Sequence, residues 1–232
     1  MWVHRHLLPA AVILMPAVAA AEQPVDVELV LAVDVSGSVD ADEQALERTG
    51  LVQALQDQGV IEAISRLPLG LAVAVVAFAG AGQTRTIVPW RRLTDDGQIA
   101  GFGAEIAGAF PVVFEYAHKT AIGDAIDWSR QELMGNGYRG RPEIDVVGDG
   151  QSSDGEYPGP ARDRAVAVGI TINGLAILNE EPYLDEYYRR TVIGGPGAFV
   201  LTTVDYESFA LAMRRKLLQE IAPGPSAARG PI

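Results

Sequence analysis

The hydrophobic residues of this chain occur in short runs, and the two longest runs have the pattern of strands at the centre of a parallel sheet. Residues 25–35 begin with alternating polar and apolar positions and end almost entirely apolar, and residues 71–79 are apolar and rich in valine. Strands covered by helices on both faces have such near-continuous apolar runs. Shorter strand-like segments are residues 84–90, 143–148, 170–177 and 198–202.

Longer segments with helical character separate these strands. Asp40 or Asp42 is placed to cap the first of them, and Thr94 and Asp95 open the second, because side-chain oxygens at these positions accept hydrogen bonds from the free amides of a helix start. Strands that alternate with helices in this way predict an α/β domain, with a largely parallel sheet and helices on both faces. The predicted helices are residues 40–58, 94–109, 120–134, 160–169 and 205–221.

The two ends of the chain differ in composition from the middle. Residues 1–21 carry a basic start, an apolar run interrupted by Pro9 and Pro16, and a stretch of small residues. This layout is typical of a secretory signal peptide, and the run is too short and too proline-rich to favour the alternative, an uncleaved membrane anchor. Residues 222–232 are expected to form a disordered tail. We therefore expect one domain over residues 25–221, periplasmic or secreted, with no stable membrane span after cleavage of the signal peptide.

Charge and cysteine content narrow the possible functions. The chain has 232 residues, a formal net charge of -12 and no cysteine. Nucleic acid is not an expected partner, because binding to phosphates needs basic patches. The absence of cysteine excludes disulfides, thiolate catalysis and Cys-ligated zinc. An exported protein without disulfides fits a bacterial envelope better than a small secreted eukaryotic domain.

The candidate chemistry begins at the end of the first predicted strand, where the sequence reads Asp34-Val35-Ser36-Gly37-Ser38. In an open parallel sheet, functional groups gather at the carboxyl ends of the strands, beside the point where the strand order reverses. Three oxygen-bearing side chains (Asp34, Ser36 and Ser38) directed to one point would suit a hard divalent cation. On these residues alone, a polar turn that caps the following helix explains the segment equally well.

Two later segments favour the metal site. Thr120 stands just before a predicted helix, and a buried strand ends on Asp149 followed by Gly150. Together with the Asp-Val-Ser-Gly-Ser segment at Asp34, they resemble the von Willebrand factor A (VWA) domain. The metal-ion-dependent adhesion site (MIDAS) of that domain combines an Asp-x-Ser-x-Ser loop with a distant Thr and a distant Asp-Gly. The resemblance spans residues 25–221, and the chain is similar to the bacterial exported DUF1194 family in Leu-Val-Leu-Ala-Val-Asp-Val-Ser-Gly-Ser-Val-Asp and Gly-Ile-Thr-Ile-Asn-Gly-Leu-Ala-Ile.

The resemblance implies a specific fold. It implies a three-layer, doubly wound, Rossmann-like sheet of six mainly parallel strands, with strand 84–90 antiparallel at one edge. Strands 27–33 and 143–147 would be neighbours at the reversal point. Asp145 would then lie either at a strand edge or facing a helix, and the polar loop 151–155 is not expected to touch a ligand position.

The resemblance also implies a ligand set. Ser36, Ser38 and Thr120 would bind Mg²⁺ or Mn²⁺ directly, whereas Asp34 and Asp149 would act mainly through bound water. Hydroxyl ligands neutralise little of the cation's charge, so the cation keeps an affinity for a further anionic oxygen. The implied partner is a protein or peptide that offers an Asp or Glu carboxylate.

Enzymatic functions fit the residues less well. A haloacid-dehalogenase-type phosphatase needs a second Asp two residues after the first, and that position is Ser36. A serine hydrolase needs a base beside its nucleophile, but His4 and His6 leave with the signal peptide, and His118 is interpreted as an exposed loop residue. We therefore expect a non-enzymatic binding module with no catalytic residue. The open alternatives are a VWA fold with a vestigial metal site and, less favoured, a metal-dependent hydrolase or phosphatase.

Overall fold

The computed structural model of the protein describes residues 22–114 and 118–222. They form one six-stranded sheet of order β3-β2-β1-β4-β5-β6. β2 and β3 are antiparallel, and all other neighbouring strands are parallel. The predicted architecture, including the antiparallel edge strand, is therefore confirmed. The strands are β1 (Gln23–Asp34), β2 (Leu71–Phe78), β3 (Thr84–Leu93), β4 (Tyr138–Gly148), β5 (Thr171–Ile177) and β6 (Val200–Thr203).

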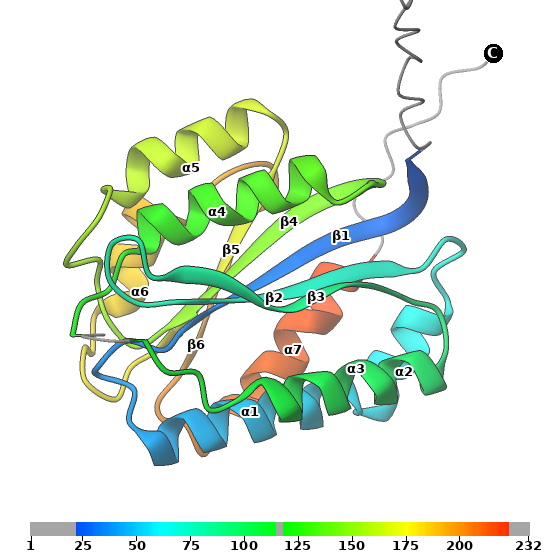
Figure 1. Ribbon diagram of the computed structural model, residues 1–232, viewed down its shortest axis with the longest axis horizontal. Coiled ribbons are helices and arrows are strands. Elements are labelled where there is room, and N and C mark those ends of the chain that lie inside the picture. The colour runs from blue at the N-terminus through cyan, green and yellow to red at the C-terminus, as the bar shows by residue number, and fades with distance from the viewer. Residues whose placement is uncertain (1–21, 115–117, 223–232) are drawn as a thin grey trace, which may run out of the picture.

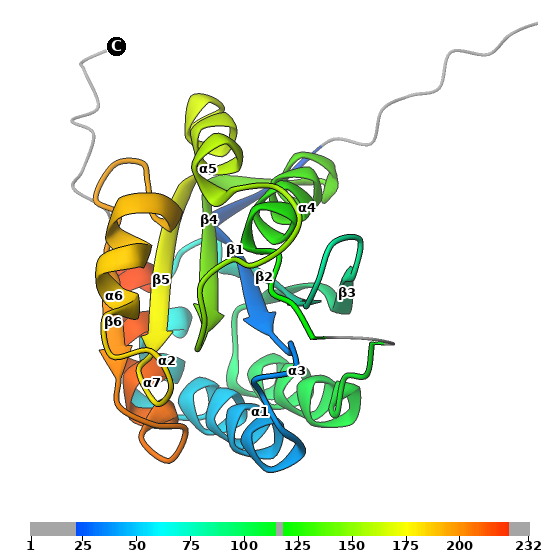
Figure 2. The ribbon, with the colours of Figure 1, turned by 90° about the vertical axis from the view of Figure 1, so that its left-hand side faces the viewer.

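Helices cover both faces of the sheet, so the structure has three layers (Figure 1). One face carries α4 (Ile122–Gly135), α5 (Pro158–Ala167) and α6 (Leu184–Tyr187), and α6 continues into a π-helical turn, η1 (Tyr188–Val192). Figure 2 looks onto the carboxyl ends of the parallel strands. The other face carries α1 (Ala41–Leu55), α2 (Gln58–Ser65), α3 (Asp96–Ala109) and α7 (Phe209–Ile221).

Strand β1 fills both halves of the hydrophobic core. Leu29, Leu31 and Val33 pack in the core formed with α1, α3 and α7, whereas Val30 and Ala32 pack in the core formed with α4 and α5. All five side chains are fully buried. Successive side chains of a strand point to opposite faces, so only an unbroken apolar sequence can fill both cores. This apolar sequence ends with Asp34 at the carboxyl end of the strand.

The helix predicted over residues 40–58 is α1, which ends at Leu55, and a second helix that was not predicted, α2, follows it. Asp40 caps α1, and the side chain of Glu43 accepts a hydrogen bond from its backbone amide in return. Asp57 then accepts a hydrogen bond from the amide of Gly59 and begins α2. α6 and η1 were also not predicted. Charged residues dominate this short segment, and only Leu184, Tyr188 and Val192 are buried.

Two strands are longer than predicted. β4 begins at Tyr138 rather than at residue 143, because its first residues pair with the start of β1 through a register shift after Pro24. β3 continues past Pro89, because its register with β2 shifts between Val73 and Val75. Proline is tolerated at such an irregularity in an edge strand, where its missing amide costs no ladder hydrogen bond.

The predicted ends of the chain are not covered by this description. The predicted signal peptide (residues 1–21) lies outside the described residues, and so does the predicted tail (222–232) apart from Ala222. Within the described ranges, no helix has the length and apolar character needed to cross a membrane.

Gly123, near the start of α4, provides a test of the packing beside the strand ends. A Cβ at this position would lie 2.1 Å from the carbonyl oxygen of Glu156. We expect Gly123→Ala to lower the free energy of unfolding by about 1–3 kcal/mol, because the backbone must shift to admit the methyl group. Gly101→Ala in α3, where a Cβ meets nothing within 4 Å, should raise it by about 0.5–1 kcal/mol. Urea denaturation measures both, and equal effects would contradict the close approach of α4 to Glu156.

Candidate metal centre

The ends of β1 and β4 lie side by side where the strand order reverses. β1 pairs with β2 on one side and with β4 on the other, and Val33 is opposite Val147 in the parallel register. Asp34 and Asp149 follow at the same edge. Gly148 permits their approach, because a Cβ there would lie only 3.1 Å from both Cβ and Oδ2 of Asp34. The fold thus brings together two acids that are far apart in the sequence.

All five predicted ligand residues belong to one hydrogen-bonded group at this edge. Oδ1 of Asp34 accepts a hydrogen bond from the amide of Ser36 at 2.8 Å. The hydroxyls of Ser36 and Ser38 are 3.2 Å apart, and Ser38 donates to Oδ1 of Asp149 at 2.8 Å. The hydroxyl of Thr120 donates to that of Ser36 at 3.0 Å. The three hydroxyl groups therefore form a chain that ends on Asp149, and the amide of Ser36 joins this chain to Asp34.

The two carboxylates are buried and incompletely paired. Asp34 and Asp149 are each 1% exposed, and Oδ2 of each has no hydrogen-bond partner. Burial, and after it the negative charge of Asp149, raises the pKa of Asp34 to about 7. Burial also raises the pKa of Asp149, and the hydrogen bond from Ser38 opposes that rise. Buried carboxylate oxygens without partners are costly, and a cation between them would offset that cost.

The donor set fits a hard divalent cation. Its side chains present only hydroxyl and carboxylate oxygens, the donors that Mg²⁺ and Mn²⁺ prefer. Across residues 22–114 and 118–222, no group of three or more His, Cys, Asp or Glu side chains is placed to hold a metal. The residues at this edge that would hold a metal are therefore Ser36, Ser38 and Thr120, with Asp34 and Asp149 to supply negative charge.

The loop that follows β4 holds Thr120 in place. The carbonyl oxygen of Thr120 accepts hydrogen bonds from the amides of Ser153 and Asp154 at 2.8 and 3.1 Å. In return, the amide of Thr120 donates to the hydroxyl of Ser153 at 3.1 Å. The expectation that residues 151–155 touch no ligand position is therefore wrong. No sequence signal reveals this contact, because backbone amides and carbonyls make most of it.

A third buried acid at the centre, Glu47, was missed by the sequence analysis. Glu47 is 1% exposed in α1, and its Oε2 atom has no hydrogen-bond partner. Burial, followed by the charges of Asp34 and Asp149, raises its pKa well above the ordinary value. The signal was available, because Gln44, Glu47 and Leu51 have the spacing of one helix face and Leu51 is a core residue.

Two other polar residues take no part in the hydrogen bonds of the centre. His118 is exposed, as expected for a loop residue. Asp145 in β4 is fully buried, and its Oδ1 atom is 2.7 Å from the ammonium group of Lys216 in α7. Of the two positions left open for Asp145, the helix-facing one is therefore correct.

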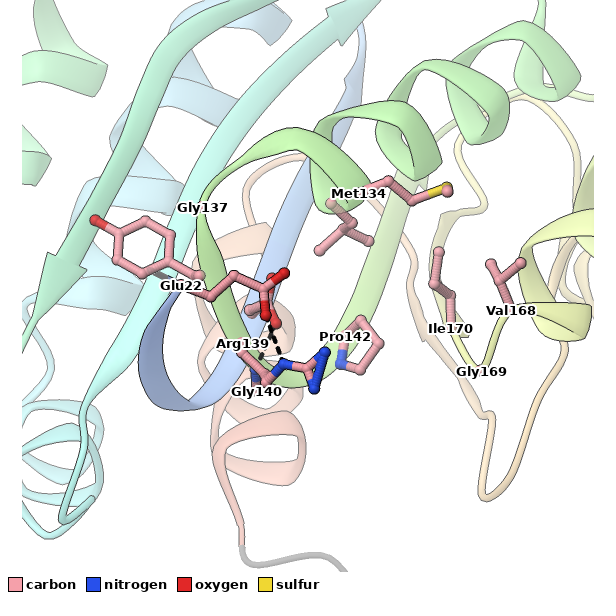
Figure 3. Close-up of a pocket in the computed structure, with 12 residues that line it drawn as sticks. Glu22, Met134, Gly137, Arg139, Gly140, Pro142, Val168, Gly169 and Ile170 are labelled. Carbon is pink, nitrogen blue, oxygen red and sulfur yellow. Dashed lines mark hydrogen bonds and ion pairs between the residues drawn. The ribbon is translucent and has the colours of Figure 1, made fainter. Parts of the chain in front are cut away.

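A cavity of about 490 Å³ lies at the opposite end of the sheet (Figure 3). The ion pair between Glu22 and Arg139, at 2.6 Å, lies on one side of it, and Met134 and Val168 contribute apolar walls. Its buried acid, Glu28, is satisfied by hydrogen bonds from Asn136 and from the amide of Gly140. This cavity therefore lacks the unpaired oxygens that distinguish the centre at Asp34.

The family model described as "Protein of unknown function (DUF1194)" matches residues 24–225. The chain belongs to the DUF1194 family. The match covers all five candidate ligands of this DUF1194 protein and confirms the resemblance found in its sequence. None of the curated proteins matches the chain.

Solved structures similar to this DUF1194 protein include a von Willebrand factor type A protein. Proximal thread matrix protein 1 from the mussel byssus, described with a zinc-occupied MIDAS motif, aligns with a TM-score of 0.60 and 17% identity over 88% of this chain and 50% of that chain. A von Willebrand factor type A protein from Catenulispora acidiphila aligns with a TM-score of 0.57 and 16% identity, over 87% of this chain and 43% of that chain. The pilus adhesin SpaC from Lactobacillus rhamnosus GG aligns with a TM-score of 0.59 and 11% identity, over 84% of this chain and 30% of that chain. The chain thus spans half or less of these proteins, and the likeness shows its fold to be VWA-like.

Proposed function

We propose that this DUF1194 protein is an exported, non-enzymatic binding module. It would capture an Asp or Glu carboxylate of a protein or peptide partner at a divalent cation, Mg²⁺ or Mn²⁺. The residues that would hold the cation are Asp34, Ser36, Ser38, Thr120 and Asp149. The composition of residues 1–21 supports export to the periplasm or beyond.

One observation carries this proposal. The hydroxyls of Thr120, Ser36 and Ser38 form a hydrogen-bonded chain that ends on Asp149, and the amide of Ser36 donates to Asp34. Each of these two buried carboxylates keeps one oxygen without a partner. A polar turn that only caps α1 would not need this arrangement, because Asp40 already caps that helix. A cation bound among hydroxyl ligands retains much of its charge and attracts a further carboxylate oxygen. The zinc-occupied MIDAS motif described for the mussel protein supports a divalent cation at such a site.

Binding fits the residues better than catalysis. The position two residues after Asp34 is Ser36, which cannot serve as the general acid–base of a phosphatase. The hydroxyl of Ser36 is hydrogen bonded to Ser38 and Thr120, and no histidine takes part in these bonds. A serine nucleophile needs such a base. The adhesin and the matrix protein among the structural neighbours also favour a binding role.

Thr120→Val tests the proposed metal centre, because it removes the hydroxyl and keeps the shape of the side chain. Calorimetric titration with Mn²⁺ should show one saturable site in the wild type and a dissociation constant about tenfold higher or more in the variant, since the loss even of groups around metal ligands costs 10–100-fold. Thr202→Val, an exposed threonine of β6, should leave the affinity unchanged. The absence of saturable binding to the wild type would support the vestigial site.

A carboxylate probe tests the second half of the proposal. A short Gly/Ser peptide with a single Asp should bind the wild type in Mg²⁺, and binding should disappear in EDTA or when the Asp is replaced by Asn. Binding that persists in EDTA would refute capture by metal. Turnover of generic phosphate or ester substrates by the wild type, lost in Thr120→Val, would favour the hydrolase alternative.

A further inference from the structure

A second cavity lies beside the loop that follows Asp149. A cavity of about 560 Å³ is lined by three tyrosines and an ion pair, namely Tyr157, Tyr183, Tyr187, Glu186 and Arg190, here called the tyrosine pocket. We propose that the tyrosine pocket binds a basic side chain, Arg or Lys, of the same protein or peptide whose carboxylate is captured at the metal centre. This inference rests on the proposed function and specifies its ligand as a segment with an acidic and a basic residue close together.

The tyrosine pocket and the metal centre share one loop. Gln151 and Ser152, which follow Asp149 closely, also line the pocket, and the amide of Ser152 donates to the hydroxyl of Tyr187 at 3.3 Å. In Figure 2, α6 and the loop after β4 both lie at the carboxyl ends of the strands, where β1 also ends. A single extended segment of a partner can therefore reach both sites.

Tyr188, which follows Tyr187 in the sequence, connects the tyrosine pocket to the metal centre. The side chain of Tyr188 is fully buried. A Cβ at Gly148 would lie 3.0 Å from its hydroxyl oxygen and 3.1 Å from Oδ2 of Asp34. The rings of Tyr187 and Tyr188 pack edge to face, with centroids 6.4 Å apart. Because of these contacts, Tyr187 is held in a fixed position relative to the end of β4.

The charge around the pocket favours a basic ligand. Arg190 lies 3.0 Å from Glu186, and Arg189 pairs with Asp185, so the two cations of this segment are compensated. Two further acids, Glu180 and Glu181, precede the segment, and the whole chain carries a net charge of -12. A partner carboxylate that approaches this surface is repelled. A basic side chain beside that carboxylate offsets the repulsion and is attracted by the surrounding field.

The tyrosine rings supply the contact surface for such a side chain. Tyr183 is 76% exposed and Tyr157 is 58% exposed, which is high for aromatic residues. The faces of tyrosine rings attract cations, and the aliphatic stem of an Arg or Lys packs against the same rings. Arg190 has its charge compensated by Glu186, so the pocket is poorly suited to a second carboxylate.

Peptides with one Asp and one Arg test this inference. A Gly/Ser peptide series places the Arg two to five residues from the Asp on either side, and matched peptides carry Gln or Glu in place of Arg. In Mg²⁺, measured by fluorescence anisotropy, the Arg peptide of the best spacing should bind the wild type about threefold to thirtyfold more tightly than its Gln counterpart. The Glu counterpart should bind more weakly than the Gln counterpart.

Variants connect this preference to the pocket. Tyr183→Ala and Tyr157→Ala should bring the Arg-to-Gln ratio of affinities close to one, without changing the affinity for Mn²⁺. Met134→Ala is the control, because Met134 is 66% exposed and lines the cavity at the opposite end of the sheet. This variant should keep both the ratio and the Mn²⁺ affinity. Both tyrosines are largely exposed, so their loss is not expected to unfold the protein.

The outcomes separate the inference from the proposed function. If single-Asp peptides bind in a Mg²⁺-dependent manner but Arg gives no advantage at any spacing, the inference is overturned and the proposed function stands. An advantage of Arg that survives in both tyrosine variants also overturns it. If no peptide binds in a Mg²⁺-dependent manner, the proposed function fails, and the inference fails with it.

Discussion

Lys216→Met is expected to lower the free energy of unfolding by about 3–5 kcal/mol, because it leaves buried carboxylates without their cation. Lys216 in α7 is fully buried, 2.7 Å from Oδ1 of Asp145 and 2.5 Å from Oε1 of Glu220. Asn173 donates hydrogen bonds to both Glu220 and Glu143 at 3.0 Å. Two buried acids thus contact one buried ammonium group, and the third, Glu143, pairs with Arg141 at 2.9 Å. Methionine would fill the space of the lysine without its charge.

The destabilisation by Lys216→Met should depend on pH. Burial and the charge of Glu220 raise the pKa of Asp145 to about 8 and that of Glu143 to about 7. Since these pKa values in the folded protein lie above the ordinary ones, ionisation of the two acids lowers stability as the pH rises from about 4 to about 8. Lys216 opposes that effect. The loss of unfolding free energy in the variant should therefore be largest near pH 8. It should be smaller at pH 5, where protonated acids need no counter-charge.

Urea denaturation at pH 5, 6.5 and 8 measures this dependence. Arg66→Met is the matched control, because Arg66 is 78% exposed and its pair with Glu62, at 3.0 Å, faces solvent. That substitution should change stability by less than about 0.5 kcal/mol at each pH. A deficit of Lys216→Met that stays the same from pH 5 to pH 8 would contradict the electrostatic explanation and point to lost packing.

The fold could be predicted because its central strand needs an unusual composition. β1 contributes side chains to two cores, and its residues 29–33 are therefore all apolar. This pattern distinguishes a strand covered on both faces. The elements that were missed are short or irregular, although the buried Val60 and Ile64 of the eight-residue α2 do have helical spacing. α2 begins directly after α1 through a cap at Asp57, and the first residues of β4 pair only through an irregular register near Pro24. Local periodicity does not encode register.

The candidate site could be predicted only in part, for a similar reason. Asp34, Ser36 and Ser38 are local in sequence, and Thr120 and Asp149 were found through the resemblance to a known motif. The role of Ser153 depends on backbone contacts with Thr120. Outside the site, the buried Lys216 was missed because it belongs to no motif. Nothing in the sequence of α7 shows that its ammonium group faces Asp145 rather than solvent.

Asp34→Asn is expected to stabilise the metal-free protein and to remove most of the stabilisation by divalent metal. The substitution removes one of two buried carboxylates whose Oδ2 atoms have no partner, while its carbonyl oxygen can still accept the hydrogen bond from the amide of Ser36. In EDTA at pH 8, the variant should be more stable than the wild type by about 1–2 kcal/mol. Relief of the buried charge is favourable, and the new amide group must still find a hydrogen-bond acceptor.

Addition of Mg²⁺ or Mn²⁺ should invert this order. A ligand present at about 100 times its dissociation constant stabilises a folded protein by about 2.7 kcal/mol, and the variant, with its site weakened, should gain less than about 0.5 kcal/mol. Asp95→Asn is the control, because Asp95 caps α3 by accepting a hydrogen bond from the amide of Gln98 and Asn caps equally well. It should follow the wild type in both conditions.

Thermal unfolding in EDTA and in metal distinguishes a binding site from a structural one. A site built to bind metal keeps its carboxylates in an unfavourable state until the cation neutralises them, so Asp34→Asn stabilises the metal-free protein and abolishes the metal response. A vestigial site, in which Asp34 serves only to hold the turn at Ser36, would give a variant that is less stable in EDTA and a wild type that does not respond to metal. The sign of the change in EDTA and the size of the metal response together decide between the two.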